Sequence, residues 1–203
     1  MPSTVGEAFL EQAMKRSHTI IHSFALLLLF SLPVLAQSQD TGMKHFAKDG
    51  LAFDYPAVWK LEDQSQPGAQ HLVLRRGGSG AQLMILARYE KIDTPEQLAA
   101  ARHDFTEPFV EALVEQFQKM GTSAERSTIT TEVGGAKAEG VRLRAVLGGV
   151  PGNADTYSLL LGHRLVMLSL IGEDAELKEA AADWDTIRRS VKVEEAAPTK
   201  TDE

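Results

Sequence analysis

The stretch YSLLLGHRLVMLSLIG, from Tyr157 to Gly172, decides the fold because two apolar runs meet in it at Gly162-His163. A Gly-X pair between two β-rich runs is typical of a hairpin with a tight turn. His163 is therefore predicted to be a solvated turn residue. Leu165–Leu168 is apolar at both parities, and so is Leu83–Ala87. A strand with one solvent-exposed face alternates apolar and polar residues. Because these two segments do not, we predict that both are central strands covered on both faces.

Two further hairpins are predicted on either side of this pair of strands. His71–Arg76 and Ala81–Glu90 flank a turn at 77–80, and Thr128–Val133 and Lys137–Leu147 flank a turn at 134–136. The segment 148–153 then leads into the Tyr157 strand. Successive hairpins indicate a largely antiparallel sheet.

A helical segment is predicted from Thr94 to Met120, with Gly121 as its stop. Thr94 is a capping residue, Pro95 occupies the first helical position and Gln97 the third, which is a strong start signal. Pro108 would clash with the carbonyl of Asp104, so we expect a kink or a break near 104–107. The segment carries an apolar stripe at helical spacing that we interpret as core: Phe109, Val110, Leu113, Val114, Phe117 and Met120.

A last helix is predicted from Asp174 to about Ser190. Its apolar residues recur at helical spacing, and basic Arg188 and Arg189 near its end complement the helix dipole. The residues expected to share its buried face are Leu177, Ala181, Trp184, Ile187 and Val191.

The stretch GLAFDYPAVWKL, from Gly50 to Leu61, gathers three aromatic residues around one proline. Leu51 and Phe53 share one strand face, and Pro56 ends that strand because proline has no N–H for a ladder. Two interpretations are open: an aromatic corner that closes one end of the core, or a ligand box around Trp59. We favour the core corner.

Composition excludes several classes of protein. The chain has 203 residues, no cysteine and a net charge of −7. Without cysteine it has no disulfides, no thiol catalysis and no zinc site built from thiolates. A moderately acidic domain is also a poor candidate for nucleic-acid binding, which needs a basic face.

The amino-terminal region predicts export. Residues 14–36 have a basic start, an apolar run and Val34-Leu35-Ala36 at the end, which is the layout of a signal peptide cleaved after Ala36. An uncleaved anchor is the alternative. Residues 1–13 are interpreted as a start-site artefact, 37–44 as a linker, 45–193 as a single domain and 194–203 as a disordered tail. The mature protein is expected to be periplasmic or secreted, without stable membrane insertion.

The sequence contains none of three common catalytic or nucleotide-binding motifs: Gly-x-Ser-x-Gly, the P-loop and His-Glu-x-x-His. His103, Glu107 and Glu111 have helical spacing, but Pro108 interrupts them, so a solvated polar face is expected there and not a metal site. No catalytic, cofactor-binding or metal-ligating residue is predicted, and the chain is interpreted as not an enzyme.

Two pairs of arginines are candidate binding residues. Arg75 and Arg76 are neighbours in a strand and point to opposite faces. Arg142 and Arg144 share a parity, so they should line one exposed face, with a partner-binding patch as the alternative. Glu139 has the opposite parity to Arg142. The sequence alone assigns no binding residue, so the binding residues are unknown from it.

The strand 50–56 followed by Trp59, the hairpin at 162–163 and the closing run Trp184–Val191 resemble the PsbP-like and DcrB-like superfamily over residues 45–193. The resemblance implies an α+β fold, an α/β/α sandwich with a central, mainly antiparallel sheet covered by helices on both faces. It also implies binding or assembly and no cofactor. Gln37 stands where the superfamily's lipoproteins have a lipidated cysteine, so lipid anchoring does not carry over.

Taken together, these features predict an exported, non-enzymatic accessory or protein-interaction domain of the bacterial cell envelope. Its expected partner is another envelope protein. The alternative is a small-ligand-binding protein that uses a groove between the sheet and the 95–120 helices. The oligomeric state stays open.

Overall fold

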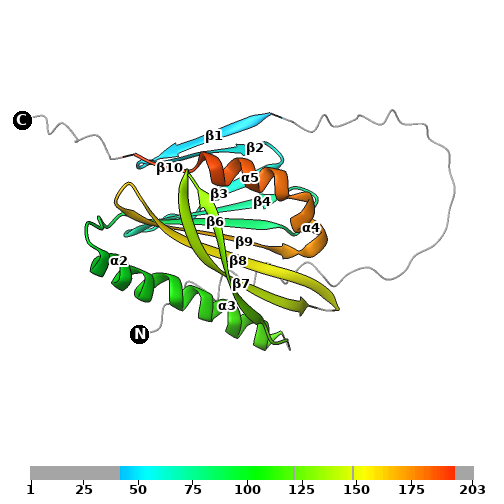
Figure 1. Ribbon diagram of the computed structural model, residues 1–203. Coiled ribbons are helices and arrows are strands. Elements are labelled where there is room, and N and C mark those ends of the chain that lie inside the picture. The colour runs from blue at the N-terminus through cyan, green and yellow to red at the C-terminus, as the bar shows by residue number, and fades with distance from the viewer. Residues whose placement is uncertain (1–41, 121, 148, 195–203) are drawn as a thin grey trace, which may run out of the picture. The chain divides into compact units, whose positions relative to one another are not determined.

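The largest element of the protein is an antiparallel sheet, seen in a computed structural model that describes residues 42–120, 122–147 and 149–194 (Figure 1). Within these residues the sheet has seven strands. Their order across the sheet is β3 (Trp59–Asp63), β4 (Ala69–Arg76), β5 (Gln82–Arg88), β9 (Arg164–Glu173), β8 (Val150–Leu161), β7 (Ala136–Leu147) and β6 (Glu125–Val133). The predictions for 1–41, Gly121, Gly148 and 195–203, which include the signal peptide and most of the tail, lie outside the described residues.

The predicted hairpins are confirmed. β8 and β9 pair over their whole length and turn at Gly162 and His163, whose φ angles of 50° and 62° match a two-residue turn with both φ positive. β4 pairs with β5, and β6 with β7. β5 and β9 lie side by side near the centre of the sheet, and Leu83–Ile85 and Leu165–Leu168 are buried. The double-sided apolar pattern therefore placed both strands correctly.

A second sheet was not predicted from the sequence. It has the order β1 (Met43–Lys48), β2 (Leu51–Pro56) and β10 (Lys192–Val193). β1 begins at Met43, inside the segment expected to be a linker and two residues before the expected domain start. Its side chains are almost all exposed, so no alternation of apolar residues marks it as a strand. The one local signal is the Asp49-Gly50 pair, whose φ angles of 48° and 79° form the β1–β2 turn.

The first helical segment is irregular where a kink or a break was expected, but its hydrogen bonding continues through a π-helical turn. It consists of α2 (Pro95–Ala101), a π-helical turn η1 (Arg102–Thr106) and α3 (Glu107–Lys119). The predicted capping box of Thr94 and Gln97 is present. Just before Pro108, the N–H of Glu107 donates to the carbonyl of Arg102, five residues back. This wider turn keeps the backbone bonded where Pro108 has no N–H to donate.

The last helical segment is broken where one helix was expected. It forms α4 (Asp174–Glu179) and α5 (Ala181–Ser190), with Ala180 between them at φ −81° and ψ −5°. The break shifts the helical phase, so Ala180 is buried and Ala181, which was expected in the buried stripe, is exposed. Ile187 and Val191 are buried as expected.

The two faces of the large sheet pack against different elements. Side chains of one parity, such as Ile85 and Leu168, form one cluster with Ile187 of α5 and Phe53 of β2. On β7 and β8, Leu143 and Ala154 of the other parity cluster with Val110, Leu113 and Phe117 of α3. Figure 1 shows α2 and α3 on one side of the large sheet, and α4, α5 and the small sheet on the other. The fold is therefore α+β with antiparallel sheets, as predicted.

The aromatic stretch forms a core corner, as favoured. Phe53 and Trp59 are each 1% exposed. The Trp59 Nε1–H donates to Asp183 Oδ2 of α5 at 3.0 Å, and Arg76 Nε donates to the same oxygen at 3.1 Å. Phe53 also stacks on Phe46 of β1, with ring centroids 5.1 Å apart. The corner thus joins both sheets to α5.

Removing the largest side chain of this corner should destabilise the whole domain. We expect Trp59→Ala to lower the free energy of unfolding by about 3–5 kcal/mol, because it leaves a cavity and removes a donor from Asp183. Val146→Ala is the control, because Val146 is 54% exposed and its loss should change stability by less than about 0.5 kcal/mol. Urea unfolding followed by circular dichroism measures both. Equal effects of the two substitutions would show that Trp59 does not close the core.

Candidate functional site

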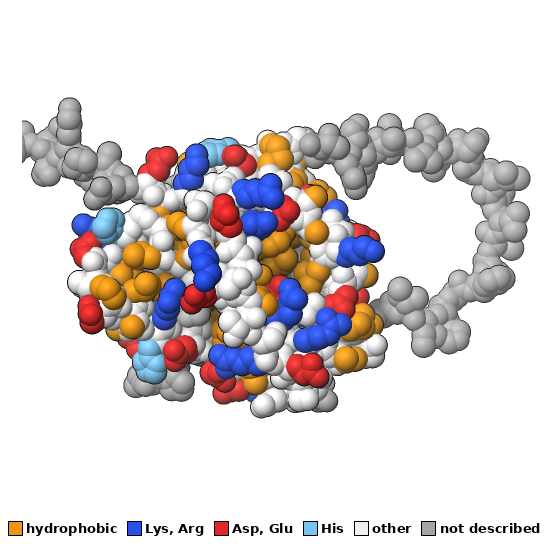
Figure 2. Space-filling view, in the orientation of Figure 1, with side chains coloured by type: hydrophobic (Ala, Val, Ile, Leu, Met, Phe, Trp, Pro, Cys, Tyr) orange, Lys and Arg blue, Asp and Glu red, His pale blue; other side chains and the backbone are white. Residues whose placement is uncertain are grey.

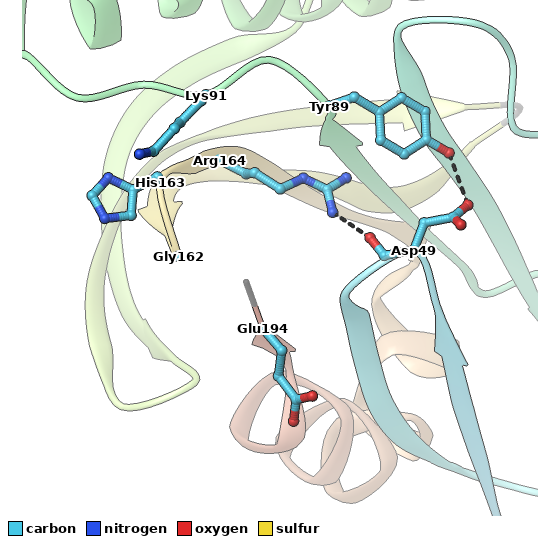
Figure 3. A pocket seen from close by; sticks show the side chains of 7 residues that line it. All are labelled: Asp49, Tyr89, Lys91, Gly162, His163, Arg164 and Glu194. Carbon is cyan, nitrogen blue, oxygen red and sulfur yellow. Dashed lines mark hydrogen bonds between the residues drawn. The ribbon is translucent and has the colours of Figure 1, made fainter. Parts of the chain in front are cut away.

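A pocket of about 250 Å³ lies where the two sheets meet (Figure 3). Its walls come from the β1–β2 turn, the segment after β5, the β8–β9 turn and the residue after β10. The lining residues are Asp49, Tyr89, Lys91, Gly162, His163, Arg164 and Glu194. Segments far apart in the sequence therefore meet here.

Arg164 is the best-anchored residue of the pocket. It is the first residue of β9 and is 9% exposed. Its guanidinium donates to the carbonyls of Arg88 at 2.5 Å, Ala87 at 3.1 Å and Asp49 at 2.8 Å, and to Gln70 Oε1 at 2.7 Å. In Figure 3 the bond to Asp49 runs from the end of the Arg164 side chain to the β1–β2 turn. These bonds span the gap between the two sheets.

Gln70 completes the connection. It is fully buried on β4, and its Nε2 donates to the carbonyl of Lys48 at 2.8 Å while its Oε1 accepts from Arg164. Lys48 makes a second link, because its Nζ donates to Asp63 Oδ2 of β3 at 2.7 Å. A buried side-chain amide is costly unless its polar atoms are bonded, and here both ends of the Gln70 amide are.

Tyr89 covers Arg164 from the solvent side. The Arg164 Cζ lies 5.1 Å from the centroid of the Tyr89 ring, a cation–π arrangement. The Tyr89 hydroxyl donates to Asp49 Oδ2 at 3.2 Å. Burial, and then the bond to the Asp49 carboxylate, raises the pKa of Tyr89, while burial lowers the pKa of Arg164. The raised pKa keeps the Tyr89 hydroxyl protonated at neutral pH, which suits a positioning role rather than proton transfer.

The turn residue His163 is exposed, as predicted, and contacts a carboxylate. Its Nδ1 lies 2.8 Å from Asp93 Oδ1, and Lys91 Nζ lies 3.5 Å from the same oxygen. The His163 carbonyl accepts from the N–H of Ile92 at 2.7 Å. These contacts attach the β8–β9 turn to the segment that leads into α2.

Gly50 shows why the end of the described chain lies so close to the pocket. The N–H of Glu194 donates to the Gly50 carbonyl at 2.8 Å. Gly50 has a φ of +79°, and a Cβ on it would lie 2.6 Å from the Glu194 carbonyl oxygen. Only glycine fits this close approach without displacing the backbone.

Polar residues that line the pocket bond to one another. Its acids and bases are mixed in sign, and Arg164, Tyr89 and Asp49 bond to one another. A catalytic constellation needs a nucleophile held against a base, and the residues that line this pocket form none. No group of three or more His, Asp or Glu side chains placed to hold a metal ion occurs in the described ranges.

Two of the three polar helix residues at helical spacing, both before Pro108, contact each other, and the third does not join them. His103 Nδ1 lies 2.9 Å from Glu107 Oε2, because the π turn continues the helix. Glu111 instead pairs with Arg126 of β6 at 2.7 Å. All four of these side chains are about half exposed or more. They form a solvated polar face, as predicted.

The arginine pairs take the predicted faces. Arg75 pairs with Glu62, whereas Arg76 turns to the other face and pairs with Asp183. Arg142 and Arg144 share a face, but each binds a carboxylate. Arg142 makes a bidentate contact with Asp155 at 2.5 and 2.6 Å. Arg144 binds Asp174 at 2.8 Å.

Sequence reasoning missed the three residues on which the pocket depends. Arg164, Gln70 and Asp49 were not singled out from the sequence. One signal was available: Arg164 directly precedes the apolar run Leu165–Leu168, and a charge at the start of a buried strand needs hydrogen-bond partners. The identity of those partners depends on contacts between segments distant in sequence.

With this geometry in place, comparisons with known proteins agree on the fold. Neither protein-family models nor curated proteins match the chain. Among solved structures, cyanobacterial PsbP (CyanoP) from Synechocystis sp. PCC 6803 is similar, with a TM-score of 0.53 and 17% identity over 76% of this chain and 94% of that one. A protein from Bacteroides thetaiotaomicron VPI-5482 has a TM-score of 0.50 and 12% identity over 75% of this chain, which spans about half of that protein's length.

These likenesses establish a PsbP-like fold. They support the PsbP-like part of the expected resemblance, and the DcrB-like part stays a prediction. The helices of the described residues are all too short or too polar to cross a membrane.

Loss of the Arg164 bonds should separate the two sheets. We expect both Arg164→Met and Arg164→Lys to lower the free energy of unfolding by at least about 2 kcal/mol, because several buried acceptors lose donors worth about 1–3 kcal/mol each. The lysine variant keeps the charge but cannot reach acceptors on both sheets. Arg144→Met is the control, since its side chain is 48% exposed and its surface pair is worth about 0–1 kcal/mol. Chemical denaturation measures all three. Full stability of Arg164→Lys would show that charge alone matters.

The Lys48–Asp63 link should give a specific dependence on pH. The hydrogen bond from Lys48, and then those from Ser65, lower the pKa of Asp63 from 3.8 to about 2. A carboxyl group whose pKa is depressed by folding contributes stability above its unfolded pKa and loses it as the pH falls. The stability difference between the unchanged chain and Asp63→Asn should therefore shrink between about pH 4 and about pH 2. Urea unfolding at several pH values measures it, and a difference that stays constant would contradict the assignment.

Proposed function

We propose that this chain is a non-enzymatic accessory domain that binds another protein of the bacterial cell envelope. The observation that carries the proposal is the use of the polar side chains at the candidate site. Arg164 gives its bonds to four protein acceptors, and Tyr89 and Asp49 bind each other. These residues hold the two sheets together and form no set of groups poised to act on a substrate.

The fold supports the same proposal. We infer that the helices and the small sheet on the two sides of the large sheet complete the α/β/α sandwich expected from the sequence. PsbP-like domains carry out accessory and assembly roles, and that resemblance favours binding over turnover. Fold likeness alone does not define an activity, so the residues at the site carry the argument.

The surface fits a protein partner better than a nucleic acid. Figure 2 shows Lys and Arg side chains beside Asp and Glu over the visible face, with apolar side chains between them. A face that binds nucleic acid gathers basic side chains of one sign. Mixed charges with apolar residues between them are typical of the rim and core of a protein interface.

The proposed location is the periplasm or the exterior of the cell, after cleavage behind Ala36. The support is the layout of residues 14–36. Glu194, the first residue of the expected disordered tail, instead bonds to Gly50, and residues 195–203 lie outside the described residues.

The alternative, a groove for a small ligand between the sheet and the 95–120 helices, receives less support. Val110, Leu113 and Phe117 fill that interval and cluster with β7 and β8. Leu98 and Phe105 pack with Ile92 and Leu165. The described pocket lies at the junction of the two sheets and not in this interval.

Crosslinking in living cells followed by mass spectrometry of the envelope fraction tests the proposal. The unchanged chain should capture one discrete envelope protein. Arg164→Met serves as the control, because a destabilised domain should capture less of a partner that needs the folded state, whereas capture of chaperones that bind unfolded chains should not fall. Turnover of a defined substrate by the pure protein, abolished by one polar substitution, would overturn the proposal.

A further inference from the structure

The strand β6 forms one edge of the large sheet, and its inner side pairs with β7. The two strands join through Gly134 and Gly135, whose φ angles of 56° and 81° define a two-residue turn with both φ positive. In such a hairpin the flanking residues, Val133 and Ala136, exchange both of their backbone hydrogen bonds. Every second residue back along β6 therefore points its N–H and C=O away from the sheet: Glu132, Thr130, Thr128 and Arg126.

One contact confirms this direction. The Nη1 of Arg188 on α5 donates to the carbonyl of Glu132 at 2.7 Å from outside the sheet. Across the described residues, no hydrogen bond from outside β6 reaches the backbone groups of Arg126, Thr128 or Thr130. The middle of the edge is thus open to another strand.

The middle of β6 lacks the features by which proteins protect an edge strand. Edges are normally blocked by charged side chains, proline or bulges. β1 carries Lys44 and Lys48, and β3 has three charged residues among five. The segment Ser127–Thr131 of β6, STITT, has no charge and no proline and is rich in residues that favour strands. β6 and β7 pair one to one from Glu125 to Val133, so no bulge bends this edge away.

The charges at the two ends of this segment complement each other when the strand meets a copy of itself. In an antiparallel pair centred on Ile129, Thr128 lies opposite Thr130 and Arg126 lies opposite Glu132. These are the residues whose backbone groups point outward, so hydrogen bonds and charges are satisfied in the same register. A shift of two residues would place Arg126 opposite an uncharged threonine.

The side chains leave room for this pairing. Arg126 and Glu132 share one face of β6, as residues six apart in a strand do. Arg126 binds Glu111 through Nη1, and a guanidinium has five N–H donors, so it can bind a second carboxylate. Opposite charges across a strand pair favour the pair, and like charges disfavour it.

We propose that β6 is a homodimer interface, at which a second copy of this chain adds its own β6 antiparallel to the first and makes one continuous sheet. The contact is isologous, so each Arg126 meets the partner's Glu132 and the two ion pairs are related by the twofold axis. This inference goes beyond the proposed function, because self-association at the sheet edge does not depend on which envelope protein the domain binds.

Two charge reversals test the register. Sedimentation velocity over a range of concentrations, with the protein in the form that accumulates in producing cells, should show a monomer–dimer equilibrium. Glu132→Arg alone and Arg126→Glu alone should each weaken the dimer by about tenfold, because each places like charges opposite one another at two symmetry-related positions. An equimolar mixture of the two variants should form a heterodimer as tight as the unchanged homodimer, because its charges are complementary again.

A cysteine crosslink tests the twofold centre. The chain has no cysteine, so one introduced thiol gives an unambiguous result. Ile129→Cys places two thiols next to each other across the axis and should form a disulfide-linked dimer on mild oxidation. Ser127→Cys is the matched control on the same face, because it lies opposite the partner's Thr131 and should crosslink much less.

Several results would overturn the proposal. A monomer at all concentrations, a dimer indifferent to both charge reversals, or equal crosslinking at positions 127 and 129 would each do so. Binding of an extended segment of another protein to the β6 edge of a monomer would also do so. Thermal unfolding of each variant, measured by circular dichroism, must match that of the unchanged chain, so that loss of the dimer is not mistaken for loss of the fold.

Discussion

The hydrogen bonds of Arg164 are the interaction on which the rest of the structure depends. The described residues form two separate sheets, and each alone would leave backbone carbonyls at their junction without donors. Arg164 and Gln70 supply these donors, and they join β1 and β2 to β4, β5 and β9. A single planar guanidinium suits this task because its donors point in several fixed directions at once. The pocket forms around this junction as a consequence.

The aromatic corner performs the same task at another place. Trp59 and Arg76 both donate to Asp183, so one carboxylate of α5 holds the first strand and the second strand of the large sheet. Phe53 and Phe46 bring the small sheet against the same core. Polar and aromatic residues that could have served a reaction are therefore used to align layers. This pattern is the physical basis for proposing a binding domain and not an enzyme.

Much of the fold could be predicted because its signals are local. The Gly162-His163 turn, the apolar runs of β5 and β9 and the Thr94–Gln97 capping box each lie within a few residues of sequence. The features that were missed depend on distant contacts. β1 has no apolar alternation and is a strand because β2 lies beside it. The π turn before Pro108 and the break at Ala180 both alter helical phase, which a pattern of fixed period cannot represent.

The sequence by itself determined the antiparallel hairpins, the central strands, the start of the long helix and the absence of thiol chemistry, because each follows from residues near one another or from composition. Only the tertiary structure decided the candidate site. Asp49, Gln70 and Arg164 belong to three different strand regions, and their meeting depends on how the two sheets pack. The tertiary structure also decided that β6 lies at an edge. The residues of β6 predict an ordinary strand, and only the order of strands in the sheet shows that one side of β6 has no neighbouring strand.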